Sequence, residues 1–199
     1  FNFFLYNRKI FSAFFLFTSL EIYIFGKKEN MISNEIANLI NQQIAKEQYA
    51  AQYYLSMSAW FYAKDLDGIA NYFRIQSKEE LMHADKMFDY LNDVGAEIRM
   101  GAIEQPPYEF ENATDIFEKA LDHEKLVTKS IFNIMKNANI EGDFATISFL
   151  QWFVNEQVEE EANASQLVTK IKMVCENPSA LYLFDQELSQ RVFVSDSGN

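Results

Sequence analysis

The sequence predicts an all-α fold: a four-helix bundle with one long crossover loop and a short fifth helix near the C-terminus. The 199 residues include only 6 glycines and 3 prolines, which is few for a β-sandwich with its many turns. Apolar residues recur every three or four positions along four long stretches, as on a helix face that packs in a bundle. A chain of this length suits one domain with a full hydrophobic core.

The first predicted hairpin lies between Ser33 and Gly95. Ser33 or Asn34 caps a helix that runs to about residue 63, and the stretch 64–68 ends it. The second helix runs from about residue 68 to about residue 94. It stops at Gly95, because a glycine after the last apolar position commonly terminates a helix.

The second predicted hairpin begins at Asn112, which forms a capping pair with Asp115 three residues later. Its first helix ends near residue 139. Its second helix runs from about residue 143 to about residue 175, and Pro178 prevents it from continuing. Residues 180–190 are expected to form the short fifth helix.

The connection over residues 95–111 determines how the two hairpins are joined. A helix of about 27 residues is about 40 Å long. About 17 extended residues reach about 55 Å, so this connection can return along the whole bundle. We therefore expect one crossover between two hairpins rather than a simple up-and-down order.

The charge balance favours cations as ligands. The chain has 17 Lys and Arg against 29 Asp and Glu, a net charge of −12 at pH 7. Nucleic acid or an anionic membrane would be held against long-range repulsion, so we expect neither as a partner. One cysteine excludes a disulfide framework and a Cys-rich zinc site, and it fits a reducing compartment such as the cytoplasm.

Residues 1–30 differ in composition from the rest of the chain. They hold 8 of the 19 phenylalanines and a broken apolar run over 10–25. No small-residue cleavage site precedes Glu21, and Glu21 interrupts the run too early for a membrane anchor. Residues with A/T-rich codons fill 22 of the 30 positions. We expect an upstream stretch read through in frame, with Met31 as the true start and a signal segment as the alternative.

The functional prediction depends on one polar layer. Each of the four apolar stripes is interrupted by a carboxylate, and these are Glu47, Glu80, Glu124 and Glu160. A buried carboxylate is costly, so the four share cations, bind protons, or lie on a misjudged helix face. Two divalent ions would balance their charge. His83 follows Glu80 on the same helix face, and carboxylate plus imidazole suits a redox-active transition metal better than Mg or Ca.

Other polar residues have plainer explanations. Gln157 lies beside the layer or forms a hydrogen bond at the edge of the core, and Gln76 is assigned to structure. His123 lies about 100° around the helix from Glu124, so it is a surface or neighbouring residue rather than a ligand. Cys175 is expected to be a small buried residue.

Four stretches make the sequence similar to the bacterial non-heme ferritins over residues 31–191, with 192–199 as a tail. They are QYAAQYYLSMSAW after Glu47, KEELMH at 78–83, HE at 123–124, and FLQWFVNEQVEEE at 149–161. The resemblance implies the ferritin-like bundle and a hollow shell of 24 identical subunits, with the short fifth helix at a symmetry axis.

The resemblance also implies which residues bind iron and oxidise it. Gln157 would lie beside the site, and Tyr54 would serve as a redox residue; Trp152 is explained by aromatic packing. A second Glu-x-x-His motif, typical of heme-binding bacterioferritins and many diiron oxygenases, is missing, which favours a centre that passes iron on. The implied ligands are Glu47, Glu80 and His83 for one iron ion, Glu80, Glu124 and Glu160 for a second, and Glu79, Glu156, Glu159 and Glu160 for a third.

By this resemblance the protein is a ferroxidase. It would oxidise Fe(II) with dioxygen, or with hydrogen peroxide, and store Fe(III) as a hydrated ferric oxide mineral, without heme. The main alternative is an iron-buffering cage that binds metal without fast turnover, although the intact ligand set argues against it. A diiron oxygenase would need a second histidine ligand. The miniature DNA-protecting relatives often carry a basic tail, and residues 191–199 are not basic.

Overall fold

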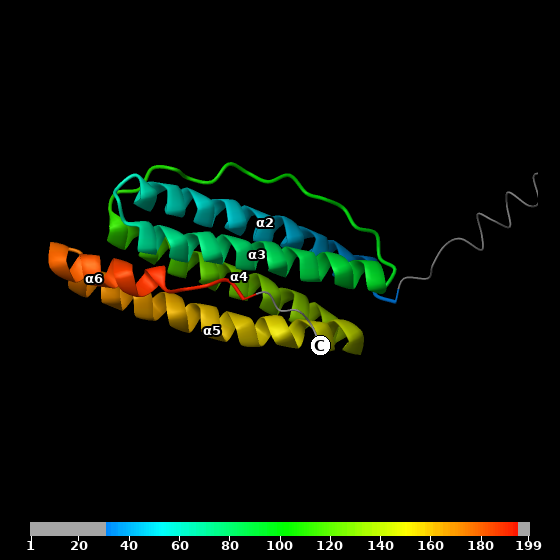
Figure 1. Cartoon of the computed structure of the whole chain (residues 1–199). Helices are drawn as coiled ribbons and strands as arrows, with labels where there is room; N and C mark the ends of the chain where they lie inside the picture. Colours follow the sequence, from blue (N-terminus) through cyan, green and yellow to red (C-terminus); the bar gives the residue numbers. More distant parts are fainter. Residues whose placement is uncertain (1–30, 195–199) are drawn as a thin grey trace, which may run out of the picture. The chain divides into compact units, whose positions relative to one another are not determined.

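The computed structural model describes residues 31–194, which contain five helices and no strand. This confirms the predicted all-α bundle with a short fifth helix (Figure 1). The expectation for residues 1–30, and the last five residues of the expected tail, lie outside the described residues. The helices are α2 (Asn34–Tyr62), α3 (Asp67–Asp93), α4 (Ala113–Glu141), α5 (Phe144–Val174) and α6 (Pro178–Ser189).

One crossover joins two helical hairpins. Helix α2 packs against α3 and α4 against α5, while the connection over residues 94–112 runs back along α2 (Figure 1). The Arg99 backbone N–H donates to Asn41 Oδ1 at 2.7 Å, and Ser56 Oγ donates to the Pro107 carbonyl at 2.5 Å. Asn41 and Ser56 are about 22 Å apart along the helix axis. The connection therefore spans much of the bundle, as its length predicts.

The predicted N-caps hold the starts of α2 and α4, and two helix boundaries differ from the prediction. Ser33 Oγ accepts from the Ile36 N–H, and Asn112 Oδ1 accepts from the Asp115 N–H at 2.9 Å. Helix α4 continues to Glu141 because Gly142, with φ 68°, closes it in the left-handed conformation. Helix α6 begins at residue 178 instead of 180, because proline fits the first turn of a helix.

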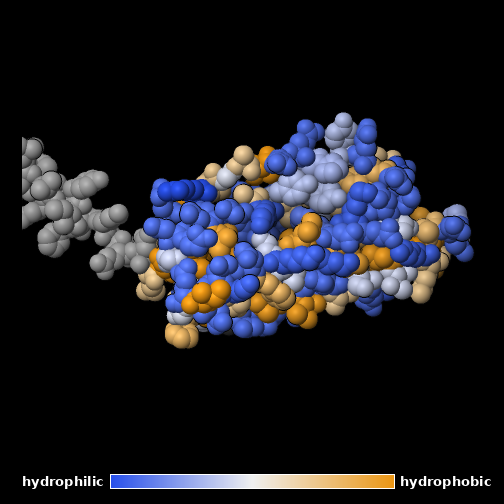
Figure 2. All heavy atoms as spheres, turned by 180° about the vertical axis from the view of Figure 1, so that it is seen from behind, coloured by the Kyte–Doolittle hydropathy of each residue, from blue (hydrophilic) through white to orange (hydrophobic). Residues whose placement is uncertain are grey.

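The hydrophobic core has two parts, one on each side of the polar layer. The four carboxylates that interrupt the apolar stripes are buried, and they lie between the two parts. Figure 2 shows a mostly hydrophilic outer face with scattered apolar side chains. None of the described helices is long and apolar enough to cross a membrane. One part includes Ile40, Met87, Ile131 and Leu150, and the other includes Phe61, Phe73, Phe117 and Ile171.

Helix α6 packs closely on the first turn of α3, which leads to a prediction about stability. Asp185 Oδ1 accepts from the Ile69 N–H at 2.9 Å, and a Cβ at Gly68 would lie 1.8 Å from the Asp185 carbonyl oxygen. Gly68→Ala should therefore lower the free energy of unfolding by an amount near the upper end of roughly 1–3 kcal/mol. Denaturant unfolding and amide hydrogen exchange of α6 would measure the loss.

Gly142→Ala is the matched control. Its Cβ would meet nothing within 4 Å, so only the left-handed backbone is strained, at a cost of about 1 kcal/mol. If Gly68→Ala proved the milder substitution and left α6 equally protected from exchange, the close packing of α6 on α3 would be contradicted.

Candidate metal centre

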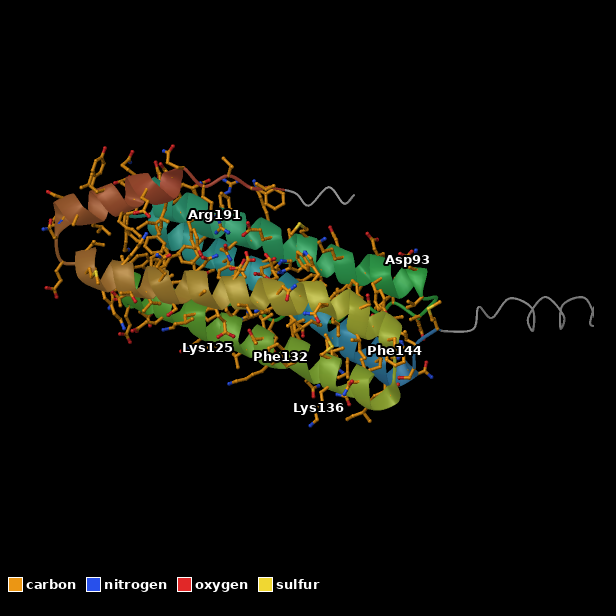
Figure 3. The ribbon with its side chains drawn as sticks, turned by 90° about the horizontal axis from the view of Figure 1, so that it is seen from below. Asp93, Lys125, Phe132, Lys136, Phe144 and Arg191 are labelled. Atoms are coloured by element: carbon orange, nitrogen blue, oxygen red, sulfur yellow. The ribbon has the colours of Figure 1, made fainter. Side chains whose placement is uncertain are left out.

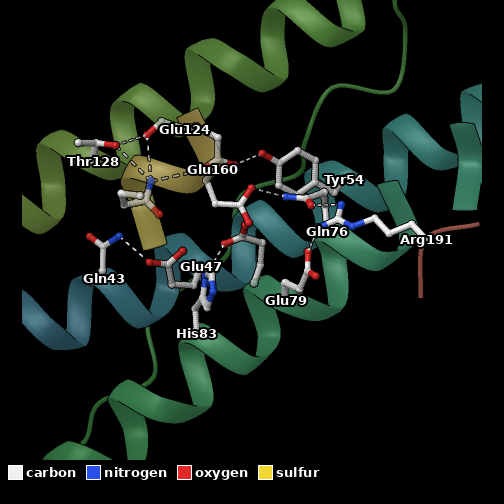
Figure 4. A network of polar contacts seen from close by, with 12 residues as sticks. Gln43, Glu47, Tyr54, Gln76, Glu79, His83, Glu124, Thr128, Glu160 and Arg191 are labelled. Atoms are coloured by element: carbon white, nitrogen blue, oxygen red, sulfur yellow. Dashed lines mark hydrogen bonds and ion pairs between the residues drawn. The ribbon is translucent and has the colours of Figure 1, made fainter. Parts of the chain in front are cut away.

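Helices α2 and α3 bring three candidate ligands together in the polar layer (Figure 4). Glu47, Glu80 and His83 each offer one ligand atom within 4.8 Å of the other two, and all three side chains are buried. Glu80 and His83 lie on one helix face at i, i+3, with Oε2 and Nδ1 3.4 Å apart. Within residues 31–194 no second group of this kind is found.

Helices α4 and α5 add two more buried carboxylates from the opposite side. The Tyr54 hydroxyl donates to Glu124 Oε1, and Gln157 Nε2 donates to Glu124 Oε2 at 3.3 Å. Gln76 Nε2 donates to Glu160 Oε2 at 3.0 Å. Gln76, assigned above to structure alone, thus contacts a predicted ligand directly. Neutral donors hold both carboxylates in the layer without adding a positive charge.

Burial raises the pKa values of the carboxylates in the metal-free layer. Burial, followed by the charge of Glu80, raises the pKa of Glu47 to about 8. Burial, followed by the charge of Glu160, raises the pKa of Glu124 to about 7. The pKa of Glu80 lies well above its usual value, first because of burial and then because of Glu124. A cation that enters the layer would replace these protons.

The donor atoms fit a metal ion. Among the described residues, three buried side-chain atoms have no hydrogen-bond partner, and two of them are Glu47 Oε2 and His83 Nε2. Gln43 Nε2 donates to the other Glu47 oxygen at 2.9 Å, which orients the carboxylate and leaves Oε2 free for a ligand. Carboxylate oxygens with one imidazole nitrogen suit a redox-active first-row metal.

Gln43 is a site residue that the sequence reading missed. Its side chain is fully buried, although it lies off the apolar stripe of α2. Ser130 Oγ on α4 donates to Gln43 Oε1, and Lys46 Nζ donates to Ser130 Oγ at 2.6 Å, so two helices fix the amide. The available signal was its position one turn before Glu47 on the same helix face.

The residues predicted for a third metal ion are not brought into one ligand group. Glu79 is part of an ion pair, with Arg191 Nη2 donating to its Oε2 at 2.7 Å. Glu156 is half-buried, close enough for its charge to act on Glu79, and Glu159 is exposed. The cation that faces Glu79 in this structure is therefore a side chain of the protein itself.

Aromatic rings border the layer on both sides. Tyr54 is fully buried, and burial followed by the charge of Glu124 holds its pKa well above the usual value. His123 lies against Tyr54 with ring centroids 6.0 Å apart, outside the ligand group. The Trp152 ring meets the His83 ring edge-on at 5.5 Å. Cys175, expected to be buried, is only half-buried at the end of α5.

Fold and site together define a class: four-helix-bundle proteins with a buried carboxylate and histidine metal centre inside one subunit. Residues 37–174 match the ferritin-like domain of the ferritin family. The chain belongs to this family.

Sequence relatives and solved structures agree with this assignment. The bacterial non-heme ferritin of Campylobacter jejuni is 42% identical over 156 residues, which cover 78% of this chain and 93% of the relative. The bacterial non-heme ferritin of Staphylococcus aureus is 36% identical over 163 residues, which cover 82% and 98%. The open pore ferritin of the archaeon Archaeoglobus fulgidus superposes with a TM-score of 0.80 and 44% identity, covering 82% of this chain and 99% of that one.

Proposed function

We propose that this chain is an iron-storage ferritin that oxidises Fe(II) at a diiron ferroxidase centre within the subunit. The observation that carries the proposal is the polar layer itself. Glu47, Glu80 and His83 are gathered there, Glu47 Oε2 and His83 Nε2 have no hydrogen-bond partner, and Glu124 and Glu160 are buried in the same layer. Burial of this many carboxylates is tolerable when cations share them.

Two ferrous ions are the substrates that this ligand set would hold. Glu47, Glu80 and His83 bind the first, and Glu124 and Glu160 bind the second with Glu80 as the bridge. Four carboxylates offset the charge of two divalent ions, as the sequence suggests. The absence of a second histidine ligand on α5 leaves the second ion with oxygen ligands alone, which lets the ferric product leave for the mineral.

The reaction we propose is a two-electron reduction of dioxygen. Each ferrous ion gives one electron to the same oxygen molecule, which takes up two protons and leaves as hydrogen peroxide. Each ferric ion then reacts with water, releases protons and joins a hydrated ferric oxide. The protein contributes the placement of the ions and the compensation of their charge. Hydrogen peroxide is a second oxidant that could accept the same two electrons.

Two further roles are proposed beside the centre. Tyr54, whose hydroxyl donates to Glu124, is placed to lend an electron during oxygen reduction. Gln157 positions Glu124 through a side-chain hydrogen bond at 3.3 Å. A third iron site at Glu79, Glu156 and Glu159 would lie at the edge of the layer.

We propose that the chain assembles into a hollow shell of 24 copies in the cytoplasm. Helix α6 carries Tyr182 and Leu183 with 61% and 67% of their side chains exposed, and such apolar surface suits a contact at a symmetry axis. The net charge of −12 would draw Fe(II) toward the shell and favour mineral formation inside it.

Aerobic addition of Fe(II) to the assembled protein tests the catalytic assignment. Glu124→Ala should slow both oxygen uptake and iron retention by at least 10- to 100-fold, because it removes a ligand of the second ion. Glu118→Ala on the same helix is the control, since Glu118 pairs with Lys172 on the surface. Equal oxidation and retention in Glu124→Ala and the parent would instead support the iron-buffering cage.

A further inference from the structure

The residues that follow α6 return toward the metal centre. We call residues 190–194 the C-terminal arm. Its backbone is held along α3, where Asn71 Nδ2 donates to the Arg191 carbonyl at 3.0 Å. Lys78 Nζ, two turns further along α3, lies 5.8 Å from the Phe193 ring centroid. Figure 3 shows Arg191 on this arm beside α3. The close packing of α6 on α3 sets the direction in which the arm leaves.

Arg191 is the only charged residue of the arm, and it points inward (Figure 4). Its side chain is only 27% exposed. Nη2 donates to Glu79 Oε2 at 2.7 Å, while Nη1 donates to Gln76 Oε1. The guanidinium also lies over the Tyr72 ring, 4.6 Å from its centroid. A planar fork with separate nitrogens for two partners, stacked on an aromatic face, is a geometry that arginine fits and lysine does not.

One amide links Arg191 to a predicted ligand. Gln76 accepts from Arg191 with its oxygen and donates with Nε2 to Glu160 Oε2 at 3.0 Å. The contact with Arg191 fixes which end of the amide faces Glu160, because an arginine can only donate. Arg191 therefore positions Glu160 indirectly, while it neutralises Glu79 directly.

Glu79 is also one of the residues of the third iron site proposed above, and it precedes Glu80 in the sequence. A second cation would have to approach Glu79 while a guanidinium occupies one of its oxygens at 2.7 Å. The positive charge of the guanidinium repels a second cation at this partly buried carboxylate. Arg191 and a metal ion therefore compete for Glu79.

We propose that Arg191 is a positioning residue that limits the centre to two metal ions. It holds Glu160 through Gln76, and it takes the place that a third ion would need at Glu79. A third ion binds only when the C-terminal arm moves away. The inference rests on the proposed function, since it concerns the ions that the diiron centre accepts.

An anaerobic titration with Co(II) tests this directly on the assembled protein. Co(II) is not oxidised under these conditions, so its absorbance and binding heat report the number and affinity of bound ions without turnover. The parent should bind two ions per subunit tightly. Arg191→Gln should still bind a pair of ions, the second less tightly because Glu160 loses its support through Gln76. It should bind a third ion at least tenfold more tightly than the parent does, because the competing charge is gone.

Two variants make the outcome specific. Arg99→Gln removes an arginine that donates to Glu97 at 2.6 Å on the exposed crossover, and it should leave all ion affinities unchanged. Adding Glu79→Gln to Arg191→Gln should abolish the gain at the third ion. A purely structural arginine would weaken binding when replaced, and it would not add an ion.

Failure of the role proposed for Arg191 can be distinguished from failure of the proposed diiron centre. Two tight ions in Arg191→Gln with an unchanged third affinity would overturn the role of Arg191 and leave the diiron centre standing. Gain of a third ion that survives Glu79→Gln would also overturn it, because the ion would then bind elsewhere. A parent that binds no tight pair would refute the proposed function itself.

Discussion

Glu80→Gln should abolish tight binding of a metal pair and at the same time make the metal-free protein more stable. Glu80 contributes to the three-ligand group with Glu47 and His83, and its charge interacts with Glu124 and Glu160. Replacing a residue that only supports a ligand costs 10- to 100-fold in metal affinity, so loss of this ligand should cost at least about 100-fold. Anaerobic Co(II) titration would measure that loss.

The gain in stability comes from removing the buried Glu80 carboxyl group itself. Without metal, Glu80 is a buried carboxyl group whose ionisation is opposed by burial and by neighbouring carboxylates. Glutamine has nearly the same shape and no charge to bury, so the folded state loses an unfavourable interaction. The denaturant midpoint of the metal-free variant should rise at neutral and alkaline pH.

Glu118→Gln is the control for Glu80→Gln. Its carboxylate pairs with Lys172 at 2.6 Å on the surface, where such pairs contribute little to stability. It should change neither metal affinity nor the unfolding midpoint measurably. A Glu80→Gln protein that lost stability in the metal-free form would show that the carboxylate is tolerated there by other means, contrary to the electrostatics described above.

Helix periodicity was sufficient to place the layer, because a helix repeats its faces regularly. Apolar residues recur every three or four positions on α2 and α3, and Glu47 and Glu80 fall on these positions. Both are therefore predicted to turn inward, and both are buried. The same rule placed Gln76 and Gln157 inward. It could not assign Gln76 its partners, because Glu160 and Arg191 belong to elements that meet α3 only after the hairpins and α6 have packed.

Contacts between residues far apart in the sequence could not be predicted for the same reason. Arg191 meets Glu79 across 112 positions, and Ser130 meets Gln43 across 87. No local spacing marks such pairs. The helix ends, in contrast, follow local chemistry, and only the exact extent of α4 and α6 differed from the expectation.

The two parts of the core explain why a layer so unfavourable by itself is accepted. Apolar side chains on either side of the layer bury enough surface to fold the bundle. The buried carboxylates between them raise the free energy of the metal-free folded state, and metal binding can lower it again. This coupling makes the stability of the metal-free protein decline as pH rises, and metal binding should remove the decline.

Metal-free protein should become less stable as the pH rises from about 6.5 to about 8. The pKa of Glu47 is about 8 in the folded state and 4.5 in the usual case, so the folded protein keeps a proton that the unfolded chain has released. A state that binds more protons is disfavoured as pH rises, by about 1.4 kcal/mol per pH unit and proton. The loss over this window should be about 2 kcal/mol from Glu47 alone. Glu124, whose pKa is about 7, adds to it in the lower half of the window.

The window is chosen so that the histidine does not obscure the slope. Burial lowers the pKa of His123 to about 4 from its usual 6.5, so its contribution rises with pH and is almost complete at pH 6.5. Glu47→Gln removes one of the groups responsible and should make the decline over the window shallower. Denaturant midpoints at fixed protein concentration, measured at several pH values, give the slope for each protein.

Divalent metal should remove this decline. Binding requires the ionised carboxylates, so the ion displaces the protons of Glu47 and Glu124, and its affinity increases with pH. Calorimetry in buffers of different ionisation enthalpy should detect release of at least about one proton per subunit near pH 6.5. The metal-bound protein should keep its stability over the range in which the metal-free form loses it, because its carboxylates, like those of the unfolded chain, carry no protons there. Parallel slopes for the two forms, with no proton released, would mean that the layer is already ionised without metal, and the electrostatic account of the centre would fail.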